Sequence, residues 1–348
     1  MRVLSNGQVA EALASAAQDE EGHRRTALDR ASRAAMFGWP EEASALVERD
    51  EPLTSLPAVG PWLAPRILEL VAHPPDPEDI VPPPEIRSGF LTLAEVRAAL
   101  AADPERVASL RGDLQMHTTF SDGAVSIREM AGSGQARGYA YVGITDHSKS
   151  LKVARGMDEE RLANHGQEIE ALNADAAAAG SGFRALRSIE MDLTPEGEGD
   201  MDPAALARLD LVLGAFHTKL RQTDDQTERY VAGVRNPTVT VLAHPTTRKW
   251  GRRLGLPAEW RAVFQAAFEA GTAVEIDGSP DRQDLPVPLL GAAVESGVTF
   301  SLGSDAHAPG ELAFIDYAMA AAIIAGIPVD RILNHRSADE VVAWAAGR

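Results

Sequence analysis

The sequence has 348 residues, of which 45% are hydrophobic and 24% charged, so it is long enough for one large domain with a buried core and a second, smaller one. It contains no cysteine, which excludes disulfides, thiolate metal sites and cysteine nucleophiles and is typical of a reducing compartment. A net charge of −18 argues against non-specific binding to nucleic acid, which requires clustered cations. We see neither a signal peptide nor a run of about 18 apolar residues, and we expect a cytoplasmic protein with no membrane partner.

Residues 1–72 predict a small all-helical domain, because apolar residues recur at helical spacing in successive runs. At 53–71 the sequence LTSLPAVGPWLAPRILELV places a tight turn between two helical runs and resembles a helix-hairpin-helix. The whole segment is similar to the small N-terminal domain of the family X DNA polymerases. Arg66 stands where that domain can carry a Schiff-base lysine, and because arginine cannot act as an amine nucleophile, lyase chemistry is excluded. The alternatives of DNA binding and of packing or oligomerisation stay open.

Residues 73–110 are predicted to form a linker and a connecting helix. The linker contains HPPDPEDIVPPPEIR, which is acidic and rich in proline and therefore typical of a stiff, extended segment. An amphipathic run then leads to Arg111. No segment of the length of a polymerase palm lies between the two domains, so polymerase activity is not expected.

Beyond Arg111, strand-like runs alternate with helical ones. This alternation implies parallel strands joined by right-handed crossovers. It predicts the α/β fold class, with a distorted (β/α)7 TIM-like barrel over residues 111–348 and a site at the carboxyl ends of its strands. The strand-like runs lie near residues 113–117, 140–146, 184–192, 210–217, 239–244, 273–278 and 298–304.

Most of these runs end in a histidine or a carboxylate. A lone histidine at a strand end is more often structural, but the strand ends of a parallel barrel converge, so the joint pattern indicates a site for divalent metal ions. The candidate ligands are His117, Asp122, His147, Glu190, His217, His244, Asp305 and His307. The other histidines, His23, His73, His165 and His335, are interpreted as surface or packing residues without an acidic partner.

The candidate ligands lie in the motifs GDLQMHTTFSDG, GYAYVGITDHS, IEMDL, HTKLR, LAHPT and GSDAH. With these motifs, residues 111 to about 345 resemble the PHP (polymerase and histidinol phosphatase) family, in particular the PHP domain that ends bacterial family X polymerases. The resemblance implies three divalent ions and nine ligands in a barrel cleft. Eight of the ligand positions match the candidates above, and the ninth, the first histidine of an H-x-H pair, is Gln115 here.

Gln115 and Asp122 both shift the donor set toward oxygen. Glutamine is a poor ligand for zinc, and Asp122 stands where some members of the family have a histidine. We therefore expect two to three divalent ions, with Mn²⁺ favoured and Zn²⁺ or Fe²⁺ as alternatives.

Such a cluster predicts an enzyme, a metal-dependent hydrolase of phosphate esters. Closely spaced divalent ions bind phosphate oxygens and lower the pKa of a bound water, so a metal-activated water is the expected nucleophile. The predicted catalytic residues are Glu190, His217 and Asp305. The few lysines lie in loops that follow metal-bearing strands, and the candidate substrate contacts in these loops are Arg248, Arg155 and Lys219.

Three functions remain as alternatives. The first is hydrolysis of phosphodiesters at nucleic-acid ends, as a 3′–5′ exonuclease or a 3′-end processing enzyme, with DNA as partner; the hairpin segment favours it. The second is a small-molecule phosphomonoesterase of the histidinol-phosphatase type, which suits the acidic composition. The third is a non-catalytic scaffold stabilised by metal. The sequence does not distinguish the substrate or the oligomeric state.

Overall fold

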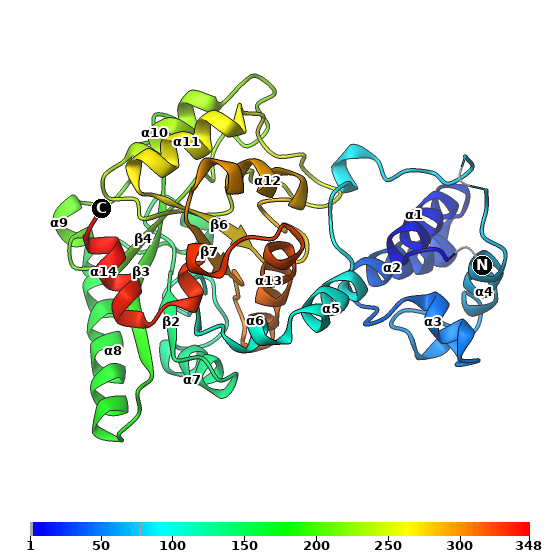
Figure 1. Ribbon diagram of the computed structural model, residues 1–348, viewed down its shortest axis with the longest axis horizontal. Helices are drawn as coiled ribbons and strands as arrows, with labels where there is room; N and C mark the ends of the chain where they lie inside the picture. The colour runs from blue at the N-terminus through cyan, green and yellow to red at the C-terminus, as the bar shows by residue number, and fades with distance from the viewer. Residues whose placement is uncertain (1–2, 77) are drawn as a thin grey trace. The chain divides into compact units, whose positions relative to one another are not determined.

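The computed structural model describes residues 3–76 and 78–348. The chain folds into two compact units, Met1–Ala102 and Asp103–Arg348. Helices make up the first unit, whereas the second is built around a sheet (Figure 1). Within the described residues, no helix is both long and apolar enough to cross a membrane.

The core of the first unit is organised around Trp39, which is fully buried. Its indole Nε1 donates a hydrogen bond to the carbonyl of Pro57 at 2.9 Å, which ties the end of the second helix to the segment predicted as a hairpin. A 2.6 Å ion pair between Arg87 and Glu11 fastens the end of the proline-rich linker onto the first helix. The helices of this unit are α1 (Asn6–Ala16), α2 (Gly22–Phe37), α3 (Ala43–Glu48), α4 (Ala64–Ala72) and α5 (Leu93–Ala102).

The segment 53–71 has one short and one longer helical element. A 3-10 turn, Leu53–Ser55, comes first, and α4 begins nine residues further on. Ala58 in the intervening turn has a φ of 62°, a left-handed conformation that residues with a Cβ adopt rarely.

The second unit confirms the predicted seven-stranded parallel sheet. Its strands follow one another in sequence order, each paired in parallel with the next. Because strands of such a sheet are covered on both faces, they read as continuous apolar runs, and every residue of β4 is buried. The strands are β1 (Gly112–Asp113), β2 (Tyr141–Ile144), β3 (Arg184–Asp192), β4 (Leu211–Ala215), β5 (Val241–Leu242), β6 (Ala273–Asp277) and β7 (Phe300–Gly303).

The first and last strands meet along a seam that nearly closes the barrel. Past the strand ends, the Asp305 amide donates to the Gln115 carbonyl at 3.1 Å. Asn334, which is fully buried, bridges the same seam lower down. Its Oδ1 accepts from the Leu302 amide at 2.7 Å, and its Nδ2 donates to the carbonyls of Gly112 at 2.9 Å and Leu302 at 2.8 Å. One side-chain amide therefore replaces missing backbone pairs between β1 and β7.

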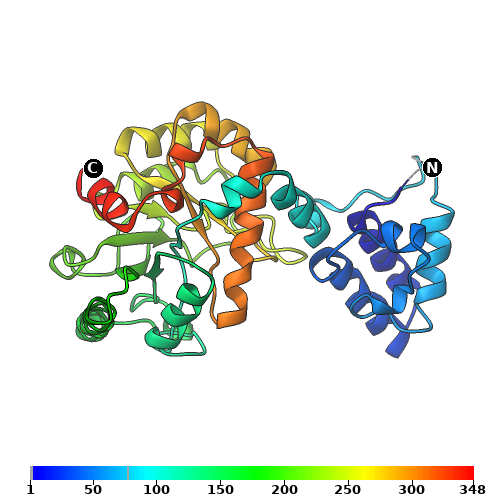
Figure 2. The ribbon, with the colours of Figure 1, turned by 60° about the horizontal axis from the view of Figure 1, so that its bottom comes forward.

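Helices surround this barrel, as two views of the ribbon show (Figures 1 and 2). The predicted (β/α)7 TIM-like architecture is therefore confirmed. Each strand is followed by a helical segment that returns the chain to the start of the next strand. The helices of this unit are α6 (Pro104–Ala108), α7 (Ile127–Ala136), α8 (Glu159–Ala178), α9 (Pro203–Leu206), α10 (Thr227–Arg235), α11 (Trp260–Ala270), α12 (Val287–Ser296), α13 (Ile315–Ile324) and α14 (Ala338–Ala346).

From the hydrogen bonds of Asn334 at the seam, we predict that its substitution lowers the stability of the fold. Asn334→Ala removes three buried hydrogen bonds and leaves backbone groups of both edge strands without partners, so the free energy of unfolding should fall by at least about 2 kcal/mol. Chemical denaturation followed by circular dichroism measures this. Asn164→Ala, at an exposed position of α8, is the control and should change stability by less than about 0.5 kcal/mol. An equal, small effect of both substitutions would contradict the role given to Asn334.

Candidate metal centre

Glu190 lies in the middle of a cluster at the carboxyl ends of the strands. Its Oε1 lies 2.8 Å from His244 Nε2 and 3.1 Å from His217 Nε2. Its Oε2 lies 3.4 Å from His117 Nε2 and 3.4 Å from His147 Nδ1. Four imidazole rings from four different strand ends thus surround one fully buried carboxylate side chain.

The remaining three candidate ligands extend the cluster from His117. Asp305 Oδ1 lies 3.1 Å from His117 Nε2, and the His307 ring stacks on the His117 ring with centroids 4.3 Å apart. Asp122 Oδ1 lies 3.4 Å from His307 Nε2 and 3.6 Å from His147 Nε2. The structure therefore brings together all eight predicted ligands.

Seven of these donors form three overlapping groups, and the eighth, His244, joins them through its contact with Glu190. Within each group, one donor atom of every residue lies within 4.8 Å of the others, a spacing that a metal ion can close. His117, His147 and Glu190 each belong to two groups, so they could bridge neighbouring ions. The groups are His117, Asp122, His147 and His307; His147, Glu190 and His217; and His117, Glu190 and Asp305.

The side chains of this cluster are arranged more favourably for binding divalent ions than for contacting one another. Four protonated rings around Glu190 would repel one another, whereas a neutral His217 ring that donates from Nδ1 to Asp192 directs the lone pair of its Nε2 at the Glu190 carboxylate. Cations between nitrogen and carboxylate remove both conflicts, and neutral imidazole with carboxylate oxygen is a usual donor set for Mn²⁺, Fe²⁺ or Zn²⁺. The buried His147 Nδ1 lacks a hydrogen-bond partner among the described residues, as a donor awaiting an ion would.

Hydrogen bonds behind the cluster orient two of the histidines. Asp192 Oδ1 lies 3.2 Å from His217 Nδ1, which leaves Nε2 of that ring to face Glu190. The backbone carbonyl of Asp305 lies 2.8 Å from His307 Nδ1, which leaves its Nε2 to face Asp122. Such outer contacts fix the tautomer and the direction of a metal ligand.

Asp146 holds the loop that carries His117 and Asp122. It accepts hydrogen bonds from the backbone amides of Thr118 at 2.8 Å and Ser121 at 3.0 Å, and from both hydroxyls. His165 of α8 reaches the same carboxylate, with Nε2 3.2 Å from Asp146 Oδ2.

His165 is thus a packing residue, but the expectation that it lacks an acidic partner is wrong, as it is for His73, whose Nδ1 lies 3.3 Å from Glu69 Oε1. His165 lies on α8, the next α-helix after Asp146, and the two residues meet because α8 packs against β3 and α7. Its ring is fully buried and packs edge-on against Phe120 with centroids 5.2 Å apart.

The charges of the cluster shift the proton affinities of its members. Burial alone would lower the pKa of His217, but its contacts with Asp192 and Glu190 raise it to about 9. Burial also opposes protonation of His117, and Asp305 and Glu190 outweigh it and raise the pKa of that ring. Burial dominates at His147, whose pKa falls to about 4.

Gln115 reaches the cluster through Glu190. The side chain is fully buried, and its Nε2 donates to Glu190 Oε2 at 3.2 Å. In this orientation the amide steadies the central carboxylate with a donor, where a histidine would offer a lone pair.

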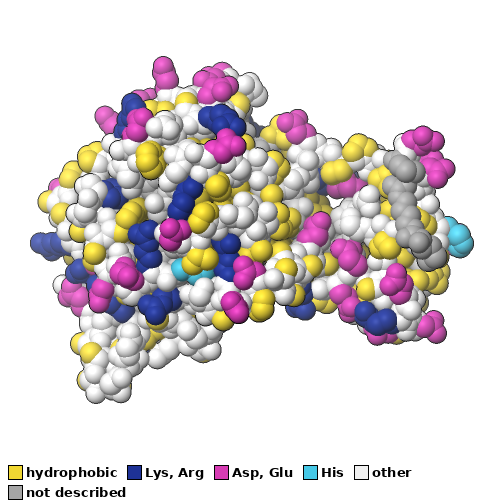
Figure 3. All heavy atoms as spheres, in the orientation of Figure 1, with side chains coloured by type: hydrophobic (Ala, Val, Ile, Leu, Met, Phe, Trp, Pro, Cys, Tyr) yellow, Lys and Arg dark blue, Asp and Glu magenta, His cyan; other side chains and the backbone are white. Residues whose placement is uncertain are grey.

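The predicted substrate contacts occupy different environments. Arg155 and Lys219 are exposed in the loops after β2 and β4, at the same end of the barrel as the ligands. Arg248 is buried, and its Nε donates to the carbonyl of Arg282 at 2.8 Å. Arg282 itself approaches the cluster, with Nε 3.3 Å from Asp305 Oδ2. On the surface, histidine atoms are visible on the larger unit among lysine and arginine side chains (Figure 3).

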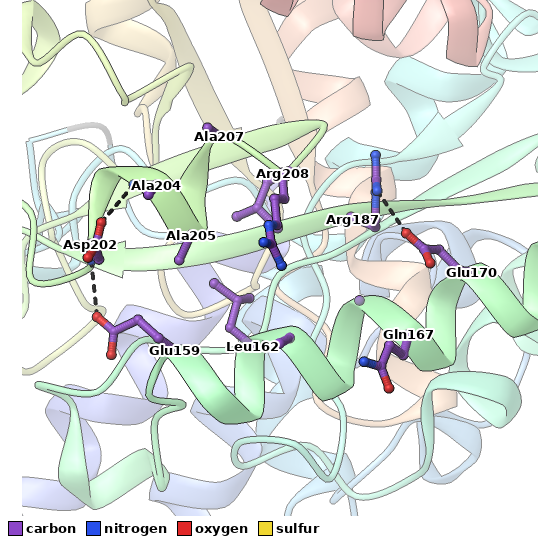
Figure 4. A pocket seen from close by; sticks show the side chains of 13 residues that line it. Glu159, Leu162, Gln167, Glu170, Arg187, Asp202, Ala204, Ala205, Ala207 and Arg208 are labelled. Atoms are coloured by element: carbon purple, nitrogen blue, oxygen red, sulfur yellow. Dashed lines mark hydrogen bonds and ion pairs between the residues drawn. The ribbon is translucent and has the colours of Figure 1, made fainter.

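A separate groove of about 630 Å³ lies on the outside of the barrel between α8, α9 and β3 (Figure 4). Its lining contains none of the eight candidate ligands. Charged side chains there are largely engaged with neighbours, since Arg187 pairs with Glu170 at 3.0 Å and Glu159 accepts from the Asp202 amide at 3.1 Å. The groove does not coincide with the metal centre.

Comparison with known proteins gives relatives of two kinds. No protein-family model matches the chain. The DNA polymerase/3'-5' exonuclease PolX of Bacillus subtilis is 37% identical over 263 residues, which make up 75% of this chain and 45% of that protein. A probable phosphatase of Syntrophotalea carbinolica is 28% identical over 236 residues, which make up 64% of this chain and 90% of that protein.

A match of 263 residues is far longer than the first unit, so it includes much of the barrel with its cluster. Both kinds of relative support the resemblance to the PHP family that the sequence motifs indicate. The match spans less than half the length of the Bacillus protein.

Among solved structures, the histidinol phosphate phosphatase of Lactococcus lactis, complexed with zinc, L-histidinol and phosphate, aligns with a TM-score of 0.46 and 16% identity, over 63% of this chain and 95% of that one. The histidinol phosphatase structure from Listeria monocytogenes aligns with the same TM-score and 13% identity, over 58% of this chain and 97% of that one.

The raised pKa values predict how metal binding depends on pH. His117 and His217 must lose a proton before their nitrogens can bind an ion, and these protons are held until the pH approaches the raised values. Mn²⁺ affinity should therefore increase between pH 6.5 and 8.5, by up to about tenfold per pH unit for each proton released. Competition with a fluorescent chelator measures it. The slope should be shallower in His217→Ala, and a flat profile in the unsubstituted protein would contradict the explanation.

Proposed function

We propose that this chain is a metal-dependent phosphoesterase that hydrolyses phosphodiesters at nucleic-acid ends, as a 3′–5′ exonuclease or a 3′-end processing enzyme. Hydrolysis of phosphate esters at a metal centre of the PHP type follows from the family and from the cluster. The observation that carries it is the placement of four histidines around Glu190. The choice of nucleic acid is supported by the similarity to the Bacillus exonuclease.

The seven grouped residues and His244 are the proposed ligands of two to three ions, with Glu190, His217 and Asp305 at the catalytic centre. Divalent ions bound there supply the activation of a water molecule and the neutralisation of phosphate oxygens. We favour Mn²⁺, because Asp122 contributes oxygen and Gln115 offers no imidazole.

The protein's own groups prepare the centre for this chemistry. Asp192 holds His217 with Nε2 directed at Glu190, and Asp146 holds the loop of His117. Charge on the substrate is met by cations at the rim, where Arg155 and Lys219 are exposed. We propose that these two side chains contact phosphates of a chain longer than one nucleotide, which is supported by their exposure in loops at the ligand end of the barrel.

A second function is favoured by a different observation. The probable phosphatase of Syntrophotalea carbinolica is matched over 90% of its own length, and a net charge of −18 suits a small anionic substrate better than a polyanion. A small-molecule phosphomonoesterase of the histidinol-phosphatase type is therefore the alternative.

Hydrolysis assays separate the two functions. With Mn²⁺ present, we expect stepwise shortening of a labelled single-stranded oligonucleotide from its 3′ end and loss of this activity with chelator. His217→Ala should lower the rate at least about 100-fold, since it removes a nitrogen that faces Glu190. Asn164→Ala, an exposed position of α8, serves as the control and should leave the rate unchanged.

Histidinol phosphate and an aryl phosphate are assayed in parallel. Activity restricted to these monoesters would replace the nucleic-acid proposal by the alternative. Inactivity on all three substrates, in protein whose metal content has been measured, would leave only the scaffold.

A further inference from the structure

Arg282 is the cation that the structure brings against the candidate metal ligands. Its Nε lies 3.3 Å from Asp305 Oδ2 and 3.7 Å from Asp277 Oδ2. The other oxygen of Asp305 faces His117 at 3.1 Å, so one carboxylate connects the guanidinium to the metal centre. The Arg282 side chain is 21% exposed, so it is not closed off from a ligand that enters the cleft.

The free part of Arg282 consists of hydrogen-bond donors. Both of its ion pairs run through Nε, and neither Nη nitrogen donates to another described residue. A guanidinium cannot lose its proton and presents its donors in one plane, a geometry that matches two oxygens of a phosphoryl group. Neutralising Asp305 and Asp277 therefore uses only one edge of the group.

The backbone of Arg282 is held by the neighbouring loop, which follows β5. Arg248 Nε donates to the Arg282 carbonyl at 2.8 Å, and the Trp250 amide donates to the Asp281 carbonyl at 2.7 Å. Lys249 Nζ lies 3.4 Å from Asp281 Oδ2. The loops after β5 and β6 are thus joined by these three contacts, and we call the joined pair of loops the clasp. Its contacts hold the backbone of Arg282 at the position from which the side chain reaches the cluster.

We propose that Arg282 binds the phosphoryl group of the substrate, and that Arg248 is a positioning residue that acts through the Arg282 carbonyl. Arg248 is 7% exposed, so direct contact with the substrate is the weaker explanation for it. This inference rests on the proposed phosphoesterase function, but its test uses phosphate binding and so does not require that the substrate be a nucleic acid.

The first experiment measures the binding of inorganic phosphate to the Mn²⁺-loaded full chain by isothermal titration calorimetry, with metal content determined in the same samples. Arg282→Ala should weaken phosphate binding at least tenfold. Arg282→Lys keeps the charge beside Asp305 but loses the planar pair of donors, so metal content should be retained and phosphate binding weakened about threefold to tenfold. Arg252→Ala removes an exposed cation from the neighbouring loop and is the matched control.

The second experiment distinguishes contact from positioning. Added guanidinium should restore at least part of the phosphate affinity of Arg282→Ala, because the vacated space is open to solvent. It should not restore that of Arg248→Ala, whose side chain is enclosed. On a hydrolysed phosphate ester, Arg282→Ala should raise KM and lower kcat together, at least tenfold in kcat/KM.

Unchanged phosphate affinity in both Arg282 variants with normal metal content would overturn the proposal. So would loss of metal ions in both with unchanged affinity per loaded centre, because Arg282 would then only neutralise the carboxylates. If the oligonucleotide is not cleaved and phosphate binding still depends on Arg282, the nucleic-acid function is wrong and the role of Arg282 stands.

Discussion

One carboxylate in contact with four imidazole rings is the arrangement on which the rest of the barrel depends. Glu190 and the rings of His117, His147, His217 and His244 come from five strand ends, and the four rings lie within 3.4 Å of its carboxylate oxygens. Burial of such a set costs free energy, because charged and polar groups leave water. The protein offsets part of this cost with outer hydrogen bonds, and bound ions provide the rest.

The barrel supplies the convergence that this cluster needs. Parallel strands in sequence order direct their carboxyl ends to one side, so each βα loop delivers its ligand to the same cleft. His117 follows β1 and Asp305 follows β7, so these two ligands lie on opposite sides of the seam between the first and last strands. The atoms His117 Nε2 and Asp305 Oδ1 are 3.1 Å apart across it. Asn334 joins the two edge strands with three buried hydrogen bonds. The contacts that close the barrel therefore also hold the strand ends that carry His117 and Asp305.

Cations accompany the acidic and neutral ligands at this end of the barrel. Arg282 lies beside Asp305, and Arg155 and Lys219 are exposed in the loops after β2 and β4. An acidic chain can in this way present a locally positive entrance once divalent ions are bound, because the ions dominate the field inside the cleft. The net charge of the chain therefore says less about the substrate than the few cations near the ligands do.

Much of the site could be predicted because each candidate ligand lies in the same short segment as the strand that positions it. An apolar run followed by a histidine or carboxylate identifies both a strand and its ligand, and all seven strands and the convergence of all eight candidate ligands follow from that pattern. His165 and Asn334 were not recognisable, because their partners Asp146 and Leu302 are reached only through packing. The pattern of residue types along the chain does not show which distant segments contact each other in the folded protein.

The sequence by itself thus determined the parallel barrel, the position of its cleft and the chemical type of its centre, because alternation and strand-end residues are properties of short segments. Only the tertiary structure decided which cation meets the centre. Arg248 follows His244 closely and is the natural candidate from the sequence, yet the clasp between two loops buries it and brings Arg282 to Asp305. Side chains at the ends of loops are placed by contacts between loops, and those contacts form only when the barrel closes.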